Sequence, residues 1–220
     1  MKVTYFGHST YLVESGETSI LVDPFNEKVG YPVPTLAPTA VTVSHEHSDH
    51  NHIQMAKGTP KLIRGLRDEG KAWAEPHDQV GPFALVTIRT YHDTSQGAER
   101  GKNAMFLYDV EGLRLLHAGD LGHTLSQDQA KAVGHVDVLF IPVGGFYTIG
   151  PKEADVVIGQ LSPRVVIPMH YKTEGNKDWP IGTVDPFLEG KNRVHRLGRT
   201  VTLTAAALPN AREVWVLSAV

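Results

Sequence analysis

The feature that most constrains this chain is a dense run of metal-binding residue types placed shortly after a β-strand. The segment Ala40–Val43 has the composition of a strand, and the hexapeptide HEHSDH follows it. His45 and His47 are two positions apart, so an extended backbone directs both rings to one side. Asp49 and His50 follow within one turn, so four ligand-type side chains converge within six residues. This spacing predicts a metal site.

The absence of cysteine narrows the chemistry of that site. The chain has 220 residues and no cysteine, which excludes disulfides, thiolate metal sites and cysteine nucleophiles. Any metal must therefore be held through nitrogen and oxygen. Twelve histidines are available for this, and their positions matter more than their number.

Further ligand candidates lie at the ends of other predicted strands. Three of them follow β-rich runs later in the chain: His92, Asp120 and His170. Strand exits meet at one edge of a sheet, where loops assemble a site on a rigid frame. A site that draws on distant loops is expected of an open, catalytic metal centre, whereas a purely local cluster could be structural.

Short β-rich runs recur through the chain, with few helices between them. The predicted strands are Val3–Phe6, Tyr11–Val13, Ser19–Val22, Ala40–Val43, Ala84–Tyr91, Ala104–Val110, Leu113–His117, Val136–Ile141, Val165–Pro168, Thr200–Leu203 and Glu213–Leu217. The predicted helices are Asp49–Lys57, a segment opened by a capping box at Ser126 and ended by Gly134, Pro151–Leu161 and Asp185–Glu189. No linker divides the chain, so we expect a single domain over residues 1–220.

Taken together, these features resemble the metallo-β-lactamase superfamily. The match is the motif His-x-His-x-Asp-His, then a lone His, then Gly-Asp, then a late His, in the family's order from His45 to His170. Four shorter matches resemble its ascorbate-phosphate lactonase-like branch of small metal-dependent hydrolases: Gly7–Ser9, Leu21–Pro24, Pro142–Gly145 and Pro168–Tyr171. The resemblance implies an α/β fold, a four-layer αββα sandwich of two mixed sheets flanked by helices, with metals at its edge.

The resemblance also implies two divalent metal ions and a division of their ligands. The first ion would be held by His45, His47 and His92. The second would be held by Asp49, His50 and His170, with Asp120 bridging the pair. We favour zinc because histidine dominates the ligands, with manganese next. Two such cations can share a water and lower its pKa toward about 7, which yields a hydroxide nucleophile.

Two residues are expected to act in catalysis. Asp49 could orient the hydroxide as well as bind metal. His8 is either a proton donor near the metals or a hydrogen-bonded turn histidine. Other residues have weaker claims: Asp23 and His117 as partners of ligand histidines, Gly144 and Gly145 as close-approach positions, Tyr147 as a loop aromatic, and Lys172 and Lys177 as anion-binding or merely solvated lysines.

The expected function is hydrolysis of a small ester, lactone or phosphate-bearing metabolite. A phosphodiesterase or nuclease is the first alternative, but the net charge of −3 gives no broad field for nucleic acid. A di-iron redox enzyme is disfavoured because such relatives carry Glu where this chain has His47. A non-catalytic metal-binding module is also disfavoured, because all seven ligand positions are filled.

The partner we expect is a small-molecule substrate. Neither nucleic acid nor a membrane is expected, and homo-oligomerisation is left open. The N-terminal sequence lacks a charged region followed by an apolar stretch, and no apolar run approaches transmembrane length. We therefore expect a cytoplasmic enzyme.

Overall fold

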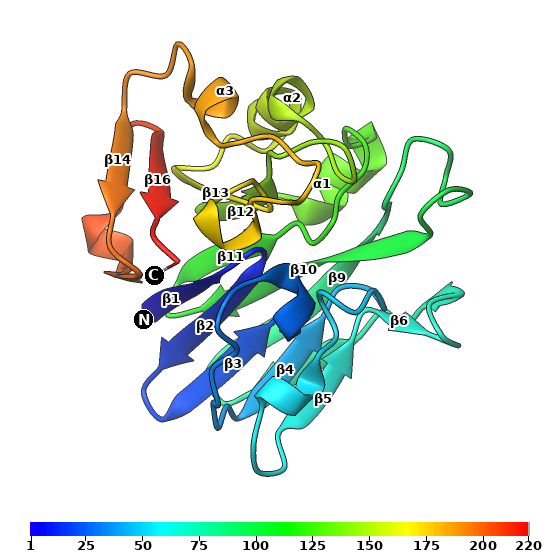
Figure 1. Cartoon of the computed structure of the whole chain (residues 1–220). Helices are drawn as coiled ribbons and strands as arrows, with labels where there is room; N and C mark the ends of the chain where they lie inside the picture. The colour runs from blue at the N-terminus through cyan, green and yellow to red at the C-terminus, as the bar shows by residue number, and fades with distance from the viewer. Residues whose placement is uncertain (220) are drawn as a thin grey trace.

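Two mixed β-sheets form the body of the protein (Figure 1). The computed structural model describes residues 1–219. The six-stranded sheet has the order β15-β1-β2-β3-β4-β5. Its strands are β1 Lys2–Gly7, β2 Thr10–Ser15, β3 Thr18–Val22, β4 Ala40–Val43, β5 Lys61–Arg64 and β15 Thr200–Thr202. Strands β1, β2 and β3 form an antiparallel series, as the sequence predicts, and β3, β4 and β5 run parallel to one another.

The second sheet has eight strands in the order β14-β16-β13-β12-β11-β10-β9-β8. They are β8 His77–Val80, β9 Phe83–Tyr91, β10 Lys102–Val110, β11 Leu113–His117, β12 Val138–Pro142, β13 Val165–Met169, β14 Val194–Leu197 and β16 Glu213–Leu217. Strands β8, β9, β10 and β11 are antiparallel to one another, whereas β11, β12, β13, β16 and β14 run parallel. A short hairpin of β6 Leu66–Arg67 and β7 Ala72–Trp73 stands apart.

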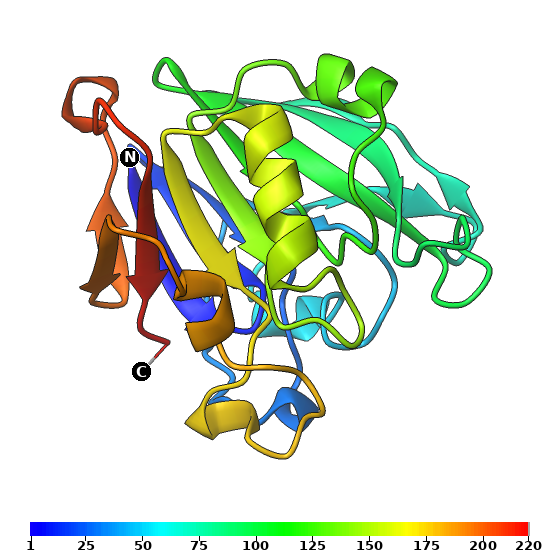
Figure 2. The ribbon, with the colours of Figure 1, turned by 90° about the horizontal axis from the view of Figure 1, so that it is seen from above.

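The α-helices lie in the second half of the chain, whereas short 3-10 turns occur in both halves. They are α1 Gln127–Val133, α2 Pro151–Leu161 and α3 Asp185–Leu188, with short 3-10 turns at η1 Glu27–Val29, η2 Ile53–Met55, η3 Glu174–Asn176 and η4 Ala205–Ala207. Figure 2 shows α2 lying across the second sheet. Every residue of β12 and β13 is buried, as expected for parallel strands covered on both faces. None of the helices in the described part of the chain is long and apolar enough to span a membrane.

Local chemistry explains why two helices form where the sequence predicts them. The side chain of Ser126 accepts a hydrogen bond from Gln129 N, and Ser126 N donates one to Gln129 Oε1, so both bonds of the capping box are present. Pro151 opens α2 at a position where its missing N–H is not needed.

The predicted helix over Asp49–Lys57 is wrong. The backbone makes a single turn, in which His50 N and Asn51 N both donate to His47 O. His52 N then donates to Pro24 O, which draws the chain away from a helical path, and only η2 follows. The predictions also omitted β5, β8 and β14, whose polar or exposed residues lack a clear alternation.

Candidate metal centre

The ends of four strands converge on one carboxylate, that of Asp120. His45 follows β4 of the first sheet, whereas His92, Asp120 and His170 follow β9, β11 and β13 of the second. Asp120 Oδ2 lies 3.0 Å from His92 Nε2, 3.4 Å from His170 Nε2 and 3.7 Å from His45 Nε2. Asp120 Oδ1 lies 3.1 Å from His50 Nε2. The structure thus places Asp120 between ligand candidates from both sheets.

The ligand-type atoms around Asp120 fall into two groups, and the atoms of each group lie within 4.8 Å of one another. The first group is His45, His47 and His92. The second is His8, Asp49, His50 and His170. These match the division implied by the sequence resemblance, except that His8 joins the second group. A third, overlapping group contains Asp23 with His45 and His50.

Several donor atoms in these groups are buried without a hydrogen-bond partner. They are Nε2 of His45, His50 and His170, and Oδ1 of Asp120. An unsatisfied buried polar atom costs about 1–3 kcal/mol, so this many at one point calls for a ligand. A divalent cation accepts nitrogen and oxygen donors of this kind, and the residues therefore fit a metal centre.

Asp23 and Ser44 orient two of the histidines. Asp23 Oδ1 accepts from Ser44 N at 2.8 Å, and Oδ2 accepts from Ser44 Oγ at 2.5 Å. His50 Nδ1 lies 2.9 Å from Asp23 Oδ2, and His45 Nδ1 lies 2.9 Å from Ser44 Oγ. Each Nδ1 can therefore donate its proton to the neighbouring oxygen, which turns each Nε2 toward the centre. The sequence predicted Asp23 in this role but not Ser44.

His8 adopts a left-handed backbone, with φ of 55°, beside the second group. Its carbonyl accepts from Tyr5 Oη at 3.0 Å and from His170 N at 2.9 Å, which ties two sheets together at this point. Its Nε2 lies 3.1 Å from Asp49 Oδ2. Burial, reinforced by the neighbouring His170, lowers the pKa of His8 to about 4. His8 is therefore neutral near pH 7 and donates its Nε2 proton to Asp49.

Burial and neighbouring charges together set the protonation of the residues around Asp120. Burial lowers the pKa of His45 well below its usual value, with His50 adding to the effect. Burial would also lower the pKa of His50, but the carboxylates of Asp120 and Asp49 overcome it and raise that pKa well above its usual value. Likewise, burial opposes ionisation of Asp120, but His170 and His50 hold the pKa of Asp120 well below its usual range. The carboxylates thus stay ionised and available to a cation.

The backbone of Asp120 is held by Asn103, a residue that the sequence analysis did not single out. Asp120 N donates to Asn103 Oδ1 at 3.0 Å, and Asn103 Nδ2 donates to Thr90 Oγ1 at 2.8 Å and Ala118 O at 2.9 Å. Gly119 has φ of +56°, and a Cβ there would lie 2.4 Å from Asn103 Oδ1. The Gly-Asp pair is therefore packed against Asn103 with no room for a side chain.

The structure also places the weaker candidates. His117 is buried; its Nε2 lies 2.9 Å from Ser9 O, and its Nδ1 accepts from Gly119 N at 3.2 Å, so it supports the loop that carries Asp120. A Cβ on Gly144 would lie 2.3 Å from His170 O, so this glycine permits close packing behind His170. Lys172 lines a separate cavity, away from the metal centre.

A cavity of about 540 Å³ opens beside the centre. Five of the ligand candidates line its wall: His47, Asp49, His92, Asp120 and His170. The rest of the wall includes Tyr147, Trp179, Arg100 and Lys28. From the sequence, Tyr147 could reach the site with its hydroxyl, although a packed loop aromatic was favoured. Trp179, Arg100 and Lys28 carried no signal in the sequence. The ligands therefore border a space large enough for a small organic substrate.

Comparison with known proteins connects this geometry to a family. The sequence matches the beta-lactamase superfamily domain over residues 2–170. It is 31% identical over 208 residues to a UPF0173 metal-dependent hydrolase of Desulforamulus reducens, covering 84% of this chain and 89% of the relative. A UPF0173 metal-dependent hydrolase of Pyrococcus furiosus is 32% identical, with the same coverage.

Solved structures show the same fold. A proposed Zn-dependent hydrolase of the metallo-β-lactamase superfamily from Thermotoga maritima superposes with a TM-score of 0.79 at 36% identity, over 98% of this chain and 97% of that chain. A proposed metal-dependent hydrolase from Parabacteroides distasonis has a TM-score of 0.69 at 18% identity, over 97% and 91% of the two chains. The second likeness shows the fold alone.

Proposed function

Since this chain belongs to the UPF0173 family of metal-dependent hydrolases, within the metallo-β-lactamase superfamily, we propose that it is a binuclear hydrolase of a small ester, lactone or phosphate-bearing metabolite. The observation that carries the proposal is the position of Asp120. Its two oxygens face His50 on one side and His92 on the other, at 3.1 and 3.0 Å. A carboxylate placed in this way can serve two cations at once.

The proposed ion is zinc, with manganese next. When bound, such ions would supply an activated water at neutral pH and would polarise the bond to be cleaved. His45, His47 and His92 would hold one ion, and Asp49, His50 and His170 the other, with Asp120 shared. The choice of zinc is supported by the predominance of histidine among the ligands and by the zinc named for the Thermotoga maritima relative.

Asp49 and His8 are the residues we propose for proton handling. Asp49 lines the cavity with a partly exposed carboxylate, whereas His8 is fully buried behind it. Burial would raise the pKa of Asp49, but His50 and the hydrogen bond from His8 lower it below its usual value. Asp49 is thus a charged acceptor that can orient the attacking water, and His8 fixes the direction of its second oxygen.

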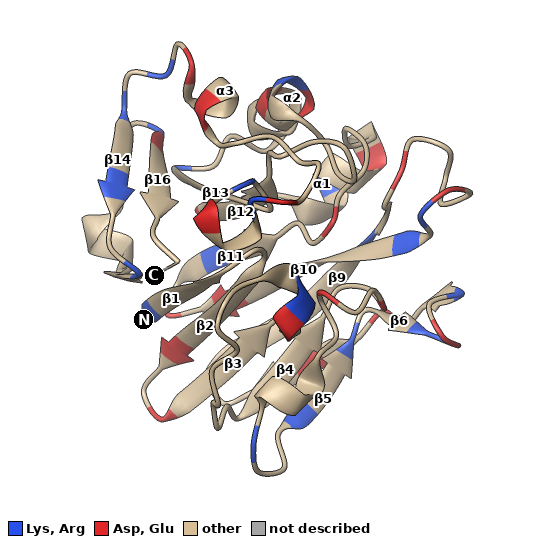
Figure 3. Cartoon of the chain, in the orientation of Figure 1, with Lys and Arg blue, Asp and Glu red and all other residues tan. Residues whose placement is uncertain are grey.

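The surface charge does not favour the phosphodiesterase alternative on nucleic acid. Figure 3 shows Lys and Arg interspersed with Asp and Glu over both sheets and the helices. A nucleic-acid groove needs a continuous basic track that neutralises several phosphates. The cavity, which is lined by both acidic and basic residues, better suits a small molecule.

The proposal is tested with a substrate panel and a chelator. Zinc-reconstituted protein is assayed on lactones, aryl esters, thioesters, phosphomonoesters and phosphodiesters. We expect hydrolysis of at least one small ester or lactone, first among lactones in view of the resemblance to the lactonase-like branch. That activity should disappear on chelation and return with zinc. Activity that is unchanged in metal-free protein would contradict the proposal.

A further inference from the structure

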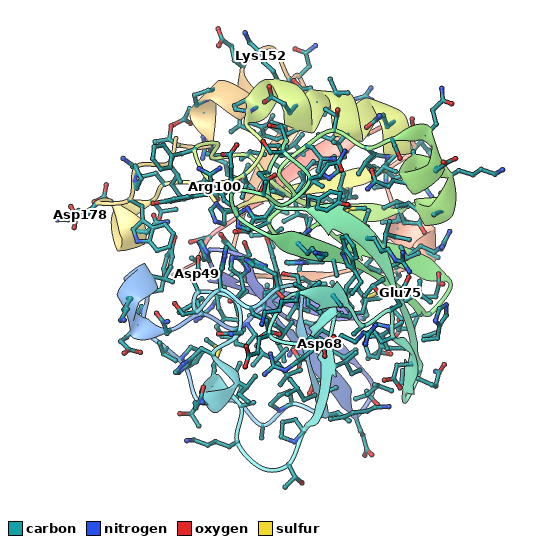
Figure 4. All side chains as sticks on the ribbon, turned by 90° about the vertical axis from the view of Figure 1, so that its right-hand side faces the viewer. Asp49, Asp68, Glu75, Arg100, Lys152 and Asp178 are labelled. Carbon is teal, nitrogen blue, oxygen red and sulfur yellow. The ribbon has the colours of Figure 1, made fainter. Side chains whose placement is uncertain are left out.

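The cavity beside the metal centre has a distinct chemical layout. Its wall carries two aromatic side chains, Tyr147 and Trp179, and two cationic ones, Lys28 and Arg100. Figure 4 shows Asp49 and Arg100 on the same flank of the molecule, with Asp178 at the outer edge. Metal binding does not require these aromatic and cationic side chains, so they are candidates for the part of the site that selects the substrate.

Arg100 is held in place by its loop. The carboxylate of Asp93 is buried and accepts four backbone N–H groups, those of Ser95 at 2.8 Å, Gly97 at 2.8 Å, Glu99 at 3.1 Å and Arg100 at 2.7 Å. The loop therefore wraps around one fixed anion. Because Asp93 directly follows His92, the position of Arg100 is tied to that of a metal ligand candidate.

A continuous wall runs from Arg100 to the metal centre. The guanidinium carbon of Arg100 lies 5.9 Å from the ring centroid of Tyr147. The Tyr147 ring lies 6.1 Å from Trp179, and the Trp179 ring lies 5.2 Å from His8, between centroids. His8 in turn contacts Asp49. A substrate bound at the metals thus has an aromatic surface along its body and a guanidinium at the end of that surface.

The guanidinium of Arg100 retains donors for a ligand. Its side chain is 33% exposed, and its Nη1 lies 3.5 Å from Glu99 Oε2, a loose contact that leaves most of its five N–H groups unused. Carboxylates and phosphates match the fork of donors that arginine presents. The cavity wall also carries the carboxylates of Glu99 and Asp178, which repel anions, so the cations Arg100 and Lys28 are the groups on it that can attract one.

We propose that Arg100 selects substrates that carry a carboxylate or phosphate group at the end remote from the bond to be cleaved, with a planar or apolar body lying along Tyr147 and Trp179. This inference rests on the proposed hydrolase function for its account of the metal end. It assigns Arg100 as a specificity residue, and it leaves the cleavage step to the metal centre.

The test uses uncleavable probes and measures binding rather than turnover. Zinc-loaded protein is titrated calorimetrically with 4-acetamidobenzoate, the phosphate analogue 4-acetamidophenylphosphonate and the neutral isostere 4-acetamidobenzamide. We expect at least one anion to bind roughly tenfold or more tightly than the amide, since hydrogen bonds between charged groups are the strong ones. The better of the two anions identifies the group as a carboxylate or a phosphate.

Variants decide whether Arg100 causes that preference. Arg100→Gln should abolish it, whereas Arg100→Lys, which keeps the charge but loses the fork, should retain part of it. Arg193 is exposed and lines a different cavity, so Arg193→Gln is the matched control and should bind like wild type. A preference that survives in Arg100→Gln, or that is absent from the wild type, overturns the inference.

Hydrolysis is measured separately, so the two proposals can fail independently. The matching acetate ester, 4-acetoxybenzoate, and the substrate panel above are assayed with the same variants. An anion preference that depends on Arg100, without hydrolysis of any panel member, would leave this inference intact and count against the hydrolase. Hydrolysis of a panel member without an anion preference that depends on Arg100 would support the hydrolase and overturn this inference.

Discussion

His50 and Asp23 form a fully buried pair in which His50 Nδ1 lies 2.9 Å from Asp23 Oδ2. The pair fixes the ring of His50 so that its Nε2 faces Asp120 at 3.1 Å. Asp23 lies at the end of β3, and His50 lies in the turn that follows β4, the neighbouring parallel strand. The geometry of the metal centre therefore depends on a residue that does not itself reach the cavity.

This pair leads to the first prediction, that Asp23→Asn weakens metal binding. The substitution removes the charge that holds the Nδ1 proton of His50, and we expect zinc affinity to fall about 10- to 100-fold. Competition with a fluorescent chelator measures it. Asp137→Asn is the control, because Asp137 is also buried and accepts from Arg114 N at 2.9 Å away from the centre. Equal affinities in both variants and wild type would contradict the assigned role.

A second prediction concerns His47, the most accessible of the ligand candidates. His47 is exposed, so His47→Ala should leave the thermal unfolding midpoint of the metal-free protein nearly unchanged. Hydrolytic activity should nevertheless be lost, because one ion loses a ligand. The exposed His77 on β8 serves as the control, and His77→Ala should retain full activity. Wild-type turnover in His47→Ala would reject the ligand assignment.

The third prediction follows from the lowered pKa of His8. Its folded pKa of about 4 is below its usual value of 6.5, so the unfolded chain binds a proton more readily. The metal-free protein should therefore lose stability as pH falls from about 6.5 to 4, by on the order of 3 kcal/mol from this residue. His8→Gln keeps an N–H donor but does not titrate.

The unfolding free energies of metal-free wild type and His8→Gln are compared by urea denaturation at several pH values. Other buried histidines contribute to both proteins, so only the difference between the two curves reports on His8. That difference should change steadily between pH 6.5 and pH 4 and level off below the lower value. Parallel curves throughout this range would show that His8 is not buried in its neutral form.

The fourth prediction separates steric crowding from backbone strain at Gly119. Gly119 and Gly112 both have positive φ, of +56° and +73°, but only at Gly119 would a Cβ clash, with Asn103 and Ser44. Gly112→Ala should cost roughly 1–2 kcal/mol of unfolding free energy, from the backbone alone. Gly119→Ala should cost clearly more and also reduce zinc affinity. Equal losses in the two variants would show that the packing around Asp120 is not tight.

The sequence was sufficient to single out the residues that the structure brings together around Asp120. His45 and His47 lie two positions apart shortly after a strand. His92, Asp120 and His170 follow strands that are predicted from their apolar runs. Their meeting was expected from the resemblance and from the general behaviour of strand ends, although the strands belong to two sheets and not to one. The Ser126 capping box likewise marks the start of α1 without any tertiary information.

The residues that the sequence missed act through long-range contacts. Asn103 pairs with Thr90 across β9 and β10 and reaches Asp120 only because the two strands are in register. Trp179 and Arg100 both lie beside Tyr147, which is distant from each of them in the sequence. The helix predicted from Asp49 failed for a similar reason, because the carbonyl of Pro24 takes the amide of His52. Spacing along the chain carries no information about such partners.

In the proposed metal centre, one chain holds two divalent ions with Asp120 between them. The most direct measurement is the zinc content of reconstituted protein by elemental analysis, after removal of loosely bound ions. We predict about two zinc ions per chain in the wild type and about one in Asp120→Ala, because the shared ligand is lost. A wild-type content of one ion or none, or two ions retained by Asp120→Ala, would contradict the account.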